Sequence, residues 1–347
     1  MKKVLLGIAT LLLTVAGNAT TTPATMVTLS NYTYSGKAEI GKLINGVIEK
    51  VEVVSNRDYF TWKKGQLQLT KKGEQAIREK KELTVELAYL LNGKPEKKAF
   101  RILHDQFHRN PVIAHRGAWK TLPTTENSIK ALQQAVKLGC AGSEFDVHMT
   151  KDDSLVVNHD AHFKGKAIED YTYAELAKDR LDNGEMLPTL RSYLEEGMKQ
   201  YGTKLIVEIK PTDKGAERAV IRARKTVALV HELGAQAWAS YISFDYNILL
   251  TVQQLDPTAH VQFLNGNKSP DELKKDGMPG LDYHYSVFQK NENWIADAKK
   301  HGMVLNVWTV NDEKTLRYFL EKGFPMITTN EPELLFRILK ASPSVSQ

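Results

Sequence analysis

Two pairs of charged residues stand two positions apart in strand-like segments of the sequence. Glu144 and Asp146 form one pair, and Glu208 and Lys210 form the other. Because side chains alternate between the two faces of a strand, each pair should project from one face. Neighbouring carboxylates repel each other unless a cation neutralises them, and their oxygens suit Mg²⁺ or Ca²⁺. The pattern therefore predicts a divalent-cation site, with pairs of solvated surface acids as the simpler alternative.

Two histidines follow strand-like runs and could serve the same site. His115 follows the apolar Val112-Ile113-Ala114, and His159 closes a second apolar run. Imidazoles titrate near neutrality, so the two rings could act as general acid and general base beside a metal. A hydrogen-bonded packing role is the alternative for a histidine at the end of a strand. We interpret His148 and His162 as surface or supporting residues.

Two further side chains near strand ends could contact a substrate. The Lys210 ammonium could bind a phosphoryl group or simply pair with a neighbouring acid. Trp308 ends a strand-like run, where it could belong to the core or form a wall against an alcohol group.

The elements that must position these residues alternate between strands and amphipathic helices from residue 111 onward. This order predicts a parallel sheet with crossover helices, and eight such units predict a (β/α)₈ TIM barrel of the α/β class. The expected strands are 111–115, 143–147, 204–209, 237–243, 260–264, 281–285, 303–308 and 326–328. The expected helices are 126–138, 189–200, 214–233, 246–255, 269–276, 291–301, 311–321 and 331–340. An insertion at about 148–187 should cover the mouth, where the loops after the strands form the catalytic face.

The chain before the barrel has a different pattern. Short alternating runs separated by turn residues over 33–105 predict a small all-β sandwich, and residues 106–347 are then the barrel domain. The stretch Tyr59-Phe60-Thr61-Trp62, followed by 65–70, weakly resembles cadherin-like modules. Residues 20–32 are rich in Thr, Ala and Ser, which is typical of a flexible leader.

The first 19 residues have the order of a secretory signal peptide. Met1-Lys2-Lys3 precede an apolar run over 4–16, and small residues follow at 17–19. The sequence therefore predicts export to the periplasm or the extracellular space. An uncleaved anchor is the alternative, but the run is shorter than the roughly 20 residues of a membrane span. Cys140 is the only cysteine, so we expect no internal disulfide and a packing role for it.

The charge of the chain gives a weaker indication. Its 347 residues carry a net charge of +6, with basic residues in scattered pairs such as Lys63-Lys64 and Lys97-Lys98. Such pairs are typical of a solvated surface, and nucleic-acid binding is not favoured without clustered Arg/Lys and interleaved aromatic residues. A mildly positive field would help a small anionic substrate to approach.

Short motifs occur in order across the barrel pattern. They are His115-Arg116-Gly117, Glu126-Asn127, Glu144-Phe145-Asp146, His159-Asp160, Leu187-Pro188-Thr189-Leu190, Glu208-Ile209-Lys210, Ser243-Phe244, Trp308-Thr309-Val310-Asn311 and Thr328-Thr329-Asn330-Glu331-Pro332. This series resembles the glycerophosphodiester phosphodiesterase family of the PLC-like phosphodiesterase superfamily. One departure is Thr124-Thr125-Glu126-Asn127, where the family commonly has Pro-Glu-Asn.

The resemblance implies an activity and a role for each site residue. The activity is metal-dependent hydrolysis of glycerophosphodiesters to glycerol 3-phosphate and an alcohol. The implied roles are Glu144, Asp146 and Glu208 as ligands of one Ca²⁺ or Mg²⁺, His115 and His159 as the acid/base pair, Arg116 and Lys210 as phosphate-binding residues, and Trp308 as the wall for the glycerol.

Two alternatives stay open at this point. One is a phospholipase D-like enzyme of the same superfamily that acts on lysophospholipid or sphingomyelin. The other is a non-catalytic surface-binding protein. The sequence does not distinguish the head-group alcohol, the metal, which histidine is the acid, the oligomeric state or the partner of the N-terminal module.

Overall fold

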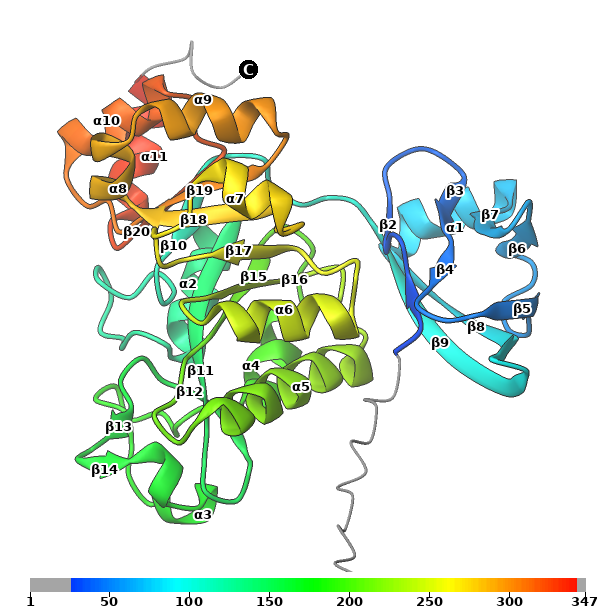
Figure 1. Cartoon of the computed structure of the whole chain (residues 1–347), viewed down its shortest axis with the longest axis horizontal. Helices are drawn as coiled ribbons and strands as arrows, with labels where there is room; N and C mark the ends of the chain where they lie inside the picture. The colour runs from blue at the N-terminus through cyan, green and yellow to red at the C-terminus, as the bar shows by residue number, and fades with distance from the viewer. Residues whose placement is uncertain (1–25, 342–347) are drawn as a thin grey trace, which may run out of the picture.

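The computed structural model describes residues 26–341, and these form an N-terminal β-region and a barrel (Figure 1). The β-region is built from short sheets that are mainly antiparallel, as predicted. Its largest sheet has the order β2-β9-β8-β5, with β2 at Thr33–Tyr34, β9 at Lys94–His104, β8 at Glu82–Leu91 and β5 at Ile48–Val53. The others join β3 (Glu39–Gly41), β7 (Gln66–Leu69) and β6 (Phe60–Lys63), and β1 (Thr28–Leu29) with β4 (Leu43–Ile44).

Two features of this region differ from the sequence expectation. Residues 26–32 were expected in a flexible leader, but Val27 and Leu29 are buried and β1 pairs with β4, so the packed chain starts earlier. The earlier part of that leader and the predicted signal peptide lie outside the described residues. The second feature is helix α1 (Lys71–Lys80), which starts where the Thr70 side chain accepts from the Gly73 N–H.

The TIM barrel is confirmed. Eight parallel strands form a closed sheet, because β10 pairs with both β11 and β20. The strands are β10 (Val112–Ala114), β11 (Gly142–Met149), β15 (Lys204–Ile209), β16 (Ala239–Ser243), β17 (Val261–Phe263), β18 (Gly280–His284), β19 (Val304–Trp308) and β20 (Met326–Thr329).

Helices surround the barrel (Figure 1). They are α2 (Ile129–Leu138), α4 (Leu190–Gly197), α5 (Ala216–Leu233), α6 (Tyr246–Leu255), α7 (Pro270–Lys275), α8 (Tyr285–Lys290), α9 (Asn293–Lys300), α10 (Glu313–Glu321) and α11 (Pro332–Ala341). The short α8 is an addition to the predicted set. No helix within residues 26–341 has the length and apolarity that crossing a membrane requires.

The insertion after β11 is a small packed unit at the lower end of the view in Figure 1. Strand β11 runs two residues further than predicted and pairs in antiparallel fashion with β12 (Leu155–Val157). The hairpin β13 (His162–Phe163) and β14 (Lys166–Ala167), the 3₁₀ helix η1 (Ile168–Asp170) and helix α3 (Tyr173–Leu176) follow. A separate apolar cluster forms its core from Val156, Phe163, Ile168, Leu176, Leu181 and Leu187.

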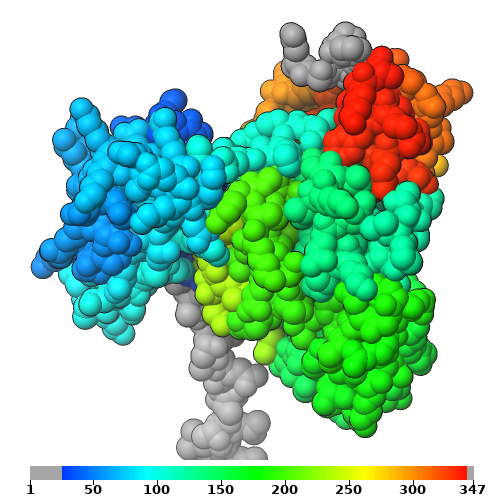
Figure 2. Space-filling model, turned by 180° about the vertical axis from the view of Figure 1, so that it is seen from behind, coloured from blue at the N-terminus to red at the C-terminus, as the bar shows by residue number. Residues whose placement is uncertain are grey.

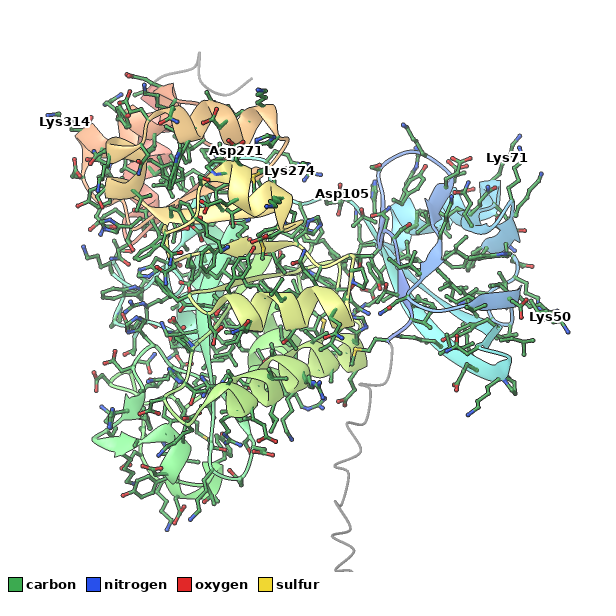
Figure 3. The ribbon with its side chains drawn as sticks, viewed as in Figure 1. Lys50, Lys71, Asp105, Asp271, Lys274 and Lys314 are labelled. Atoms are coloured by element: carbon green, nitrogen blue, oxygen red, sulfur yellow. The ribbon has the colours of Figure 1, made fainter. Side chains whose placement is uncertain are left out.

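The β-region packs beside the barrel, as Figure 2 shows from behind. The Arg101 guanidinium lies 5.0 Å from the centre of the Trp238 ring, and the Tyr201 hydroxyl donates to Glu82 at 3.2 Å. The Asn45 amide donates to the Leu255 carbonyl at 3.1 Å. Elsewhere the exposed lysines labelled in Figure 3 point outward from separate parts of the surface.

Candidate active site

Three carboxylates meet at the end of the barrel where the strands finish. Glu144 and Asp146 lie on β11, and Glu208 lies opposite Asp146 on the neighbouring β15. All three side chains are buried, and one oxygen from each lies within 4.8 Å of the others. The alternative of solvated surface acids is therefore wrong.

The three carboxylates repel one another, and the surrounding groups neutralise this repulsion only in part. Burial, reinforced by Asp146 and Glu208, raises the pKa of Glu144 well above its ordinary value. Burial and then Asp146 raise the pKa of Glu208 to about 7. Burial also acts to raise the pKa of Asp146, but Lys210 and His159 together with other donors lower it below its ordinary value. Glu144 Oε1 is buried and has no hydrogen-bond partner among the described residues.

Lys210 partly neutralises this cluster. Its ammonium lies 3.1 Å from Asp146 Oδ1 and 2.8 Å from Glu208 Oε1. Burial acts to lower the pKa of Lys210, but the two carboxylates raise it above its ordinary value, so the side chain stays charged. The Arg116 guanidinium adds a second cation, 3.8 Å from Asp146 Oδ2, so two cations face three carboxylates and leave negative charge uncompensated.

Arg116 is positioned by an unusual backbone turn after β10. Its φ of 57° lies in the left-handed region, and its N–H donates to Glu144 Oε2 at 2.9 Å. The guanidinium binds both oxygens of Glu126 at 3.0 Å. Gly117 has a φ of 80°, and a Cβ there would lie 2.7 Å from Ala131. The turn thus requires a glycine at position 117.

His115 lies beside the carboxylates with one nitrogen anchored. Nδ1 is 2.7 Å from Asn330 Oδ1, which accepts a hydrogen bond, so Nε2 is left with its lone pair. Nε2 is 3.9 Å from Glu144 Oε2. Burial, assisted by Arg116, lowers the pKa of His115 to about 4, so the ring is neutral at pH 7.

His159 faces the site from the insertion. Its Nδ1 lies 2.7 Å from Asp160 Oδ1, and the ring is partly exposed. The buried His148 supports it, because His148 Nε2 lies 3.1 Å from the His159 carbonyl oxygen. His148 thus has the supporting role that the sequence left open, whereas His162 is exposed on the hairpin.

A cavity of about 240 Å³ joins these groups. Its polar side has His115, Arg116, Glu144, His159, Glu208, Lys210, Asp282, Thr309 and Thr328, and its apolar side has Ile242, Phe244, Leu264 and Trp308. The Trp308 indole N–H donates to the Asp282 carbonyl at 2.9 Å, and its ring meets Phe244 edge to face at 5.5 Å. Every predicted site residue except Asp146 lines this cavity, and Asp146 contacts the lining residue Lys210 at 3.1 Å.

Two buried residues at the site were not among the predicted site residues, although Asn127 belongs to the Glu126-Asn127 motif. The Asn127 side chain donates to Asp146 Oδ2 at 2.8 Å and accepts from the Asp146 N–H at 3.2 Å, which fixes this carboxylate. Asp282 Oδ1 has no hydrogen-bond partner among residues 26–341, and burial and then Glu208 raise the pKa of Asp282 well above its ordinary value. An acid inside the strand-like run 280–284 was the signal that could have identified it.

Comparisons with known proteins agree on one family. The sequence profile of the glycerophosphoryl diester phosphodiesterase family matches residues 115–334. A glycerophosphodiester phosphodiesterase of Caldanaerobacter subterraneus subsp. tengcongensis is 30% identical over 249 residues, which cover 66% of this chain and 97% of that protein. The crystal structure of a glycerophosphodiester phosphodiesterase from Parabacteroides distasonis has 43% identity and a TM-score of 0.66, covering 69% of this chain and 100% of its own. A phosphodiesterase of Oleispira antarctica, solved with the product sn-glycerol-3-phosphate, has 23% identity and a TM-score of 0.57 over 66% of this chain and 96% of its own, and so shows the same fold.

Proposed function

Because the chain belongs to the glycerophosphoryl diester phosphodiesterase family, we propose that it hydrolyses glycerophosphodiesters to glycerol 3-phosphate and an alcohol, using one divalent cation and two histidines. The chain is a phosphoric diester hydrolase, and its substrate is a small glycerophosphodiester. The observation that carries the finer proposal is the cluster of three buried carboxylates beside a cavity that two histidines and a lysine also line.

The three carboxylates fit a hard cation. Glu144, Asp146 and Glu208 would hold it, since each offers an oxygen and Glu144 Oε1 has no other described partner. Mg²⁺ and Ca²⁺ take such oxygen ligands, and the candidate ligand group among the described residues contains none of the cysteines or histidines that zinc prefers. When bound, the cation would supply positive charge that neutralises the phosphodiester and polarises its P–O bonds.

The histidines are suited to different proton transfers. His115 is neutral at pH 7 with Nε2 unprotonated, so it can accept the proton of the nucleophile. That nucleophile is a water or the substrate's own glycerol hydroxyl, which would form a cyclic phosphate first. Asp160 accepts a hydrogen bond from His159 Nδ1 and would stabilise the ring when Nε2 is protonated as well, and this doubly protonated form would donate the Nε2 proton to the departing alcohol.

The remaining groups would bind and orient the substrate. Lys210 and Arg116 would contact the phosphoryl oxygens, because both cations border the cavity. The Trp308 ring, held by its hydrogen bond to Asp282 and its contact with Phe244, would form the wall for the glycerol carbons.

Removal of the metal tests the proposal most directly. Chelation should abolish hydrolysis of glycerophosphocholine, and re-addition of Mg²⁺ or Ca²⁺ should restore it, as measured by release of glycerol 3-phosphate. Full activity in metal-free buffer, with no metal found by elemental analysis, would contradict the proposed cation. A parallel assay on micellar lysophospholipid would identify the phospholipase D-like alternative if that substrate were strongly preferred.

We further propose that the protein is exported to the periplasm or the extracellular space, with cleavage near Ala19. The support is the charged start, apolar run and small residues of the first 19 positions. N-terminal sequencing of the exported protein should find the leader removed, and an intact Met1 would contradict this proposal.

A further inference from the structure

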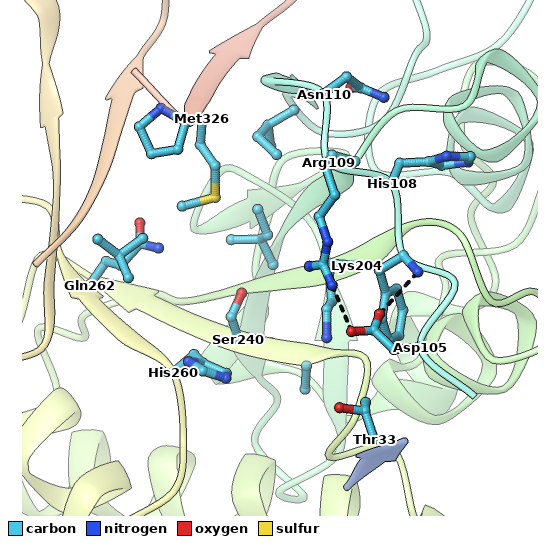
Figure 4. Close-up of a pocket in the computed structure, with 17 residues that line it drawn as sticks. Thr33, Asp105, His108, Arg109, Asn110, Lys204, Ser240, His260, Gln262 and Met326 are labelled. Atoms are coloured by element: carbon cyan, nitrogen blue, oxygen red, sulfur yellow. Dashed lines mark hydrogen bonds and ion pairs between the residues drawn. The ribbon is translucent and has the colours of Figure 1, made fainter. Parts of the chain in front are cut away.

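A second cavity, of about 430 Å³, lies at the opposite rim of the barrel from the carboxylates (Figure 4). Its barrel residues stand at the beginnings of strands, including Lys204 on β15, Ala239 on β16 and Met326 on β20. The segment 105–110 and Thr33 of the β-region border it from outside. We refer to it as the basal cavity.

The alternation of side chains on β15 connects the two ends of the barrel. Lys204, Ile206, Glu208 and Lys210 are two positions apart, so they share the inward face. Lys204 and Ile206 line the basal cavity, whereas Glu208 and Lys210 line the cavity at the mouth. The same strand therefore supplies a cation to each cavity.

Lys204 brings a positive charge to the basal cavity without a carboxylate partner. Its ammonium donates to the Ala237 carbonyl and lies 3.6 Å from the centre of the Phe107 ring, and no described acid forms an ion pair with it. Burial lowers the pKa of Lys204 to about 8. The nearby Asp105 is bound to Arg109 at 2.6 Å, as the dashed line in Figure 4 shows.

Gln262 brings an unused hydrogen-bond acceptor to the same cavity. Its side chain is 4% exposed, and Oε1 has no partner among the described residues. Gly280 makes room for it, because a Cβ there would lie 2.8 Å from Gln262 Cγ. A buried amide oxygen that lacks a donor is unfavourable, so a ligand hydroxyl or amine would be stabilised there.

The wall also has an apolar part, beside polar residues such as Ser240 and His260. Ile113, Ile206 and Met326 line the cavity, and their apolar cluster continues toward the mouth through Ile242 and Leu264. Figure 4 places Gln262 and Met326 on one side of the cavity and Asp105 and His108 on the other. A ligand in this space would meet charge, hydrocarbon and an amide oxygen at separate points.

We propose that the basal cavity binds a small amphipathic anion. Its acid group pairs with Lys204, its hydrocarbon body lies against Ile113, Ile206 and Met326, and a hydroxyl or amine on that body donates to Gln262 Oε1. This site is separate from the one that hydrolyses phosphodiesters.

Three matched eight-carbon probes test the proposal by calorimetry on the full chain. They are 3-hydroxyoctanoate, octanoate without the hydroxyl, and octane-1,3-diol without the acid group. We expect 3-hydroxyoctanoate to bind most tightly and each of the others at least tenfold more weakly. Lys204→Met should weaken both acids at least tenfold, and Gln262→Leu should reduce 3-hydroxyoctanoate to the affinity of octanoate. The exposed Lys64→Met serves as the matched control and should change nothing.

Three results would overturn the proposal. The first is absence of heat with all probes, and the second is binding that survives both Lys204→Met and Gln262→Leu. The third is binding that is lost in Trp308→Ala but kept in Lys204→Met and Gln262→Leu. That result would place the probe in the cavity beside the carboxylates. Hydrolysis by the Lys204→Met and Gln262→Leu variants reports whether the barrel is folded. Lys204→Gln, which also removes the charge, replaces Lys204→Met if the latter does not fold.

Discussion

At the scale of single residues, the carboxylate cluster should lower the stability of the metal-free protein. Burial raises the pKa of Glu208 from 4.5 to about 7, so between these values the folded protein binds more protons than the unfolded chain. The contribution of Glu208 to stability is full below about pH 4.5 and is lost as the pH rises through about 7. Thermal unfolding after chelation should therefore show Tm falling over that interval.

Glu208→Gln should flatten this pH dependence and raise the Tm of the chelated protein near neutral pH, because it removes one of the repelling charges. The same change should weaken metal affinity and slow hydrolysis at least tenfold. Glu52→Gln, at an exposed acid of β5, is the control and should affect neither property. A Tm that is unchanged by Glu208→Gln would mean that Lys210 already compensates the cluster.

The two histidines should be needed for turnover and not for folding. Replacement of His115 or His159 by Ala should each slow hydrolysis by about 10²–10⁴-fold, because each removes a proton carrier. His162→Ala tests the same insertion at an exposed ring and should keep the normal rate. Near-normal rates for both His115→Ala and His159→Ala would show that these residues have a packing role and do not transfer protons.

The charged site residues could be predicted from the sequence, because the alternation of side chains along a strand depends only on positions close together in the chain. Glu144, Asp146, Glu208 and Lys210 share a site since each pair has a spacing of two and the strands are neighbours in a closed barrel. The contacts of Asn127 with Asp146 and of Asn330 with His115 could not be read in this way. They depend on loop paths that bring together positions far apart in the chain.

At the scale of elements, a buried arginine connects the insertion to the barrel. Arg222 of α5 donates to the Lys210 carbonyl at 2.6 Å and to the Pro211 carbonyl at 3.1 Å, and it also pairs with Glu169 of η1. The Thr212 hydroxyl donates to the same glutamate at 2.5 Å. Lys210, which directly follows β15, is therefore fixed to the unit that carries His159.

Arg222→Met should be destabilising, by up to about 3–5 kcal/mol, because it leaves the largely buried Glu169 with only a 3.9 Å contact to Arg218 and the Thr212 hydroxyl. Chemical unfolding measures this cost, and the double variant Arg222→Met with Glu169→Gln should recover part of it. Lys72→Met removes the exposed partner of Asp58 and should cost little. Equal costs for the two single variants would show that the Arg222 network adds nothing beyond a surface pair.

The barrel strands were predictable to within about two residues, whereas the additional helices were not. Parallel strands buried on both faces read as continuous apolar runs, and each is followed by an amphipathic helix. Helix α1 has only Gly73, Ala76 and Ile77 as buried residues, so its apolar periodicity is weak. Its capping by Thr70 was the available signal, but the alternating runs around it favoured strands.

At the scale of the whole molecule, the β-region contacts the barrel away from the mouth. Its contacts reach Trp238, Tyr201 and Leu255, and none of these residues lines the mouth cavity. We therefore propose that the region is separable. A chain that starts at His104 should keep its kcat on soluble glycerophosphodiesters but have a lower Tm, because the Trp238 face becomes exposed. A truncated protein that is folded yet inactive would show that the two parts are functionally coupled.

Strand β15 should tolerate residue replacements better than insertions or deletions. Deletion or insertion of one residue would shift its register and turn Leu205, Val207 and Ile209 toward the barrel axis. Both cavities would then lose their lysines in a single step, and Glu208 would leave the cluster. The strand should therefore tolerate conservative replacements at its outward positions in a library of variants, yet no single-residue insertion or deletion. The hairpin turn at Lys164-Gly165 should accept such changes in length.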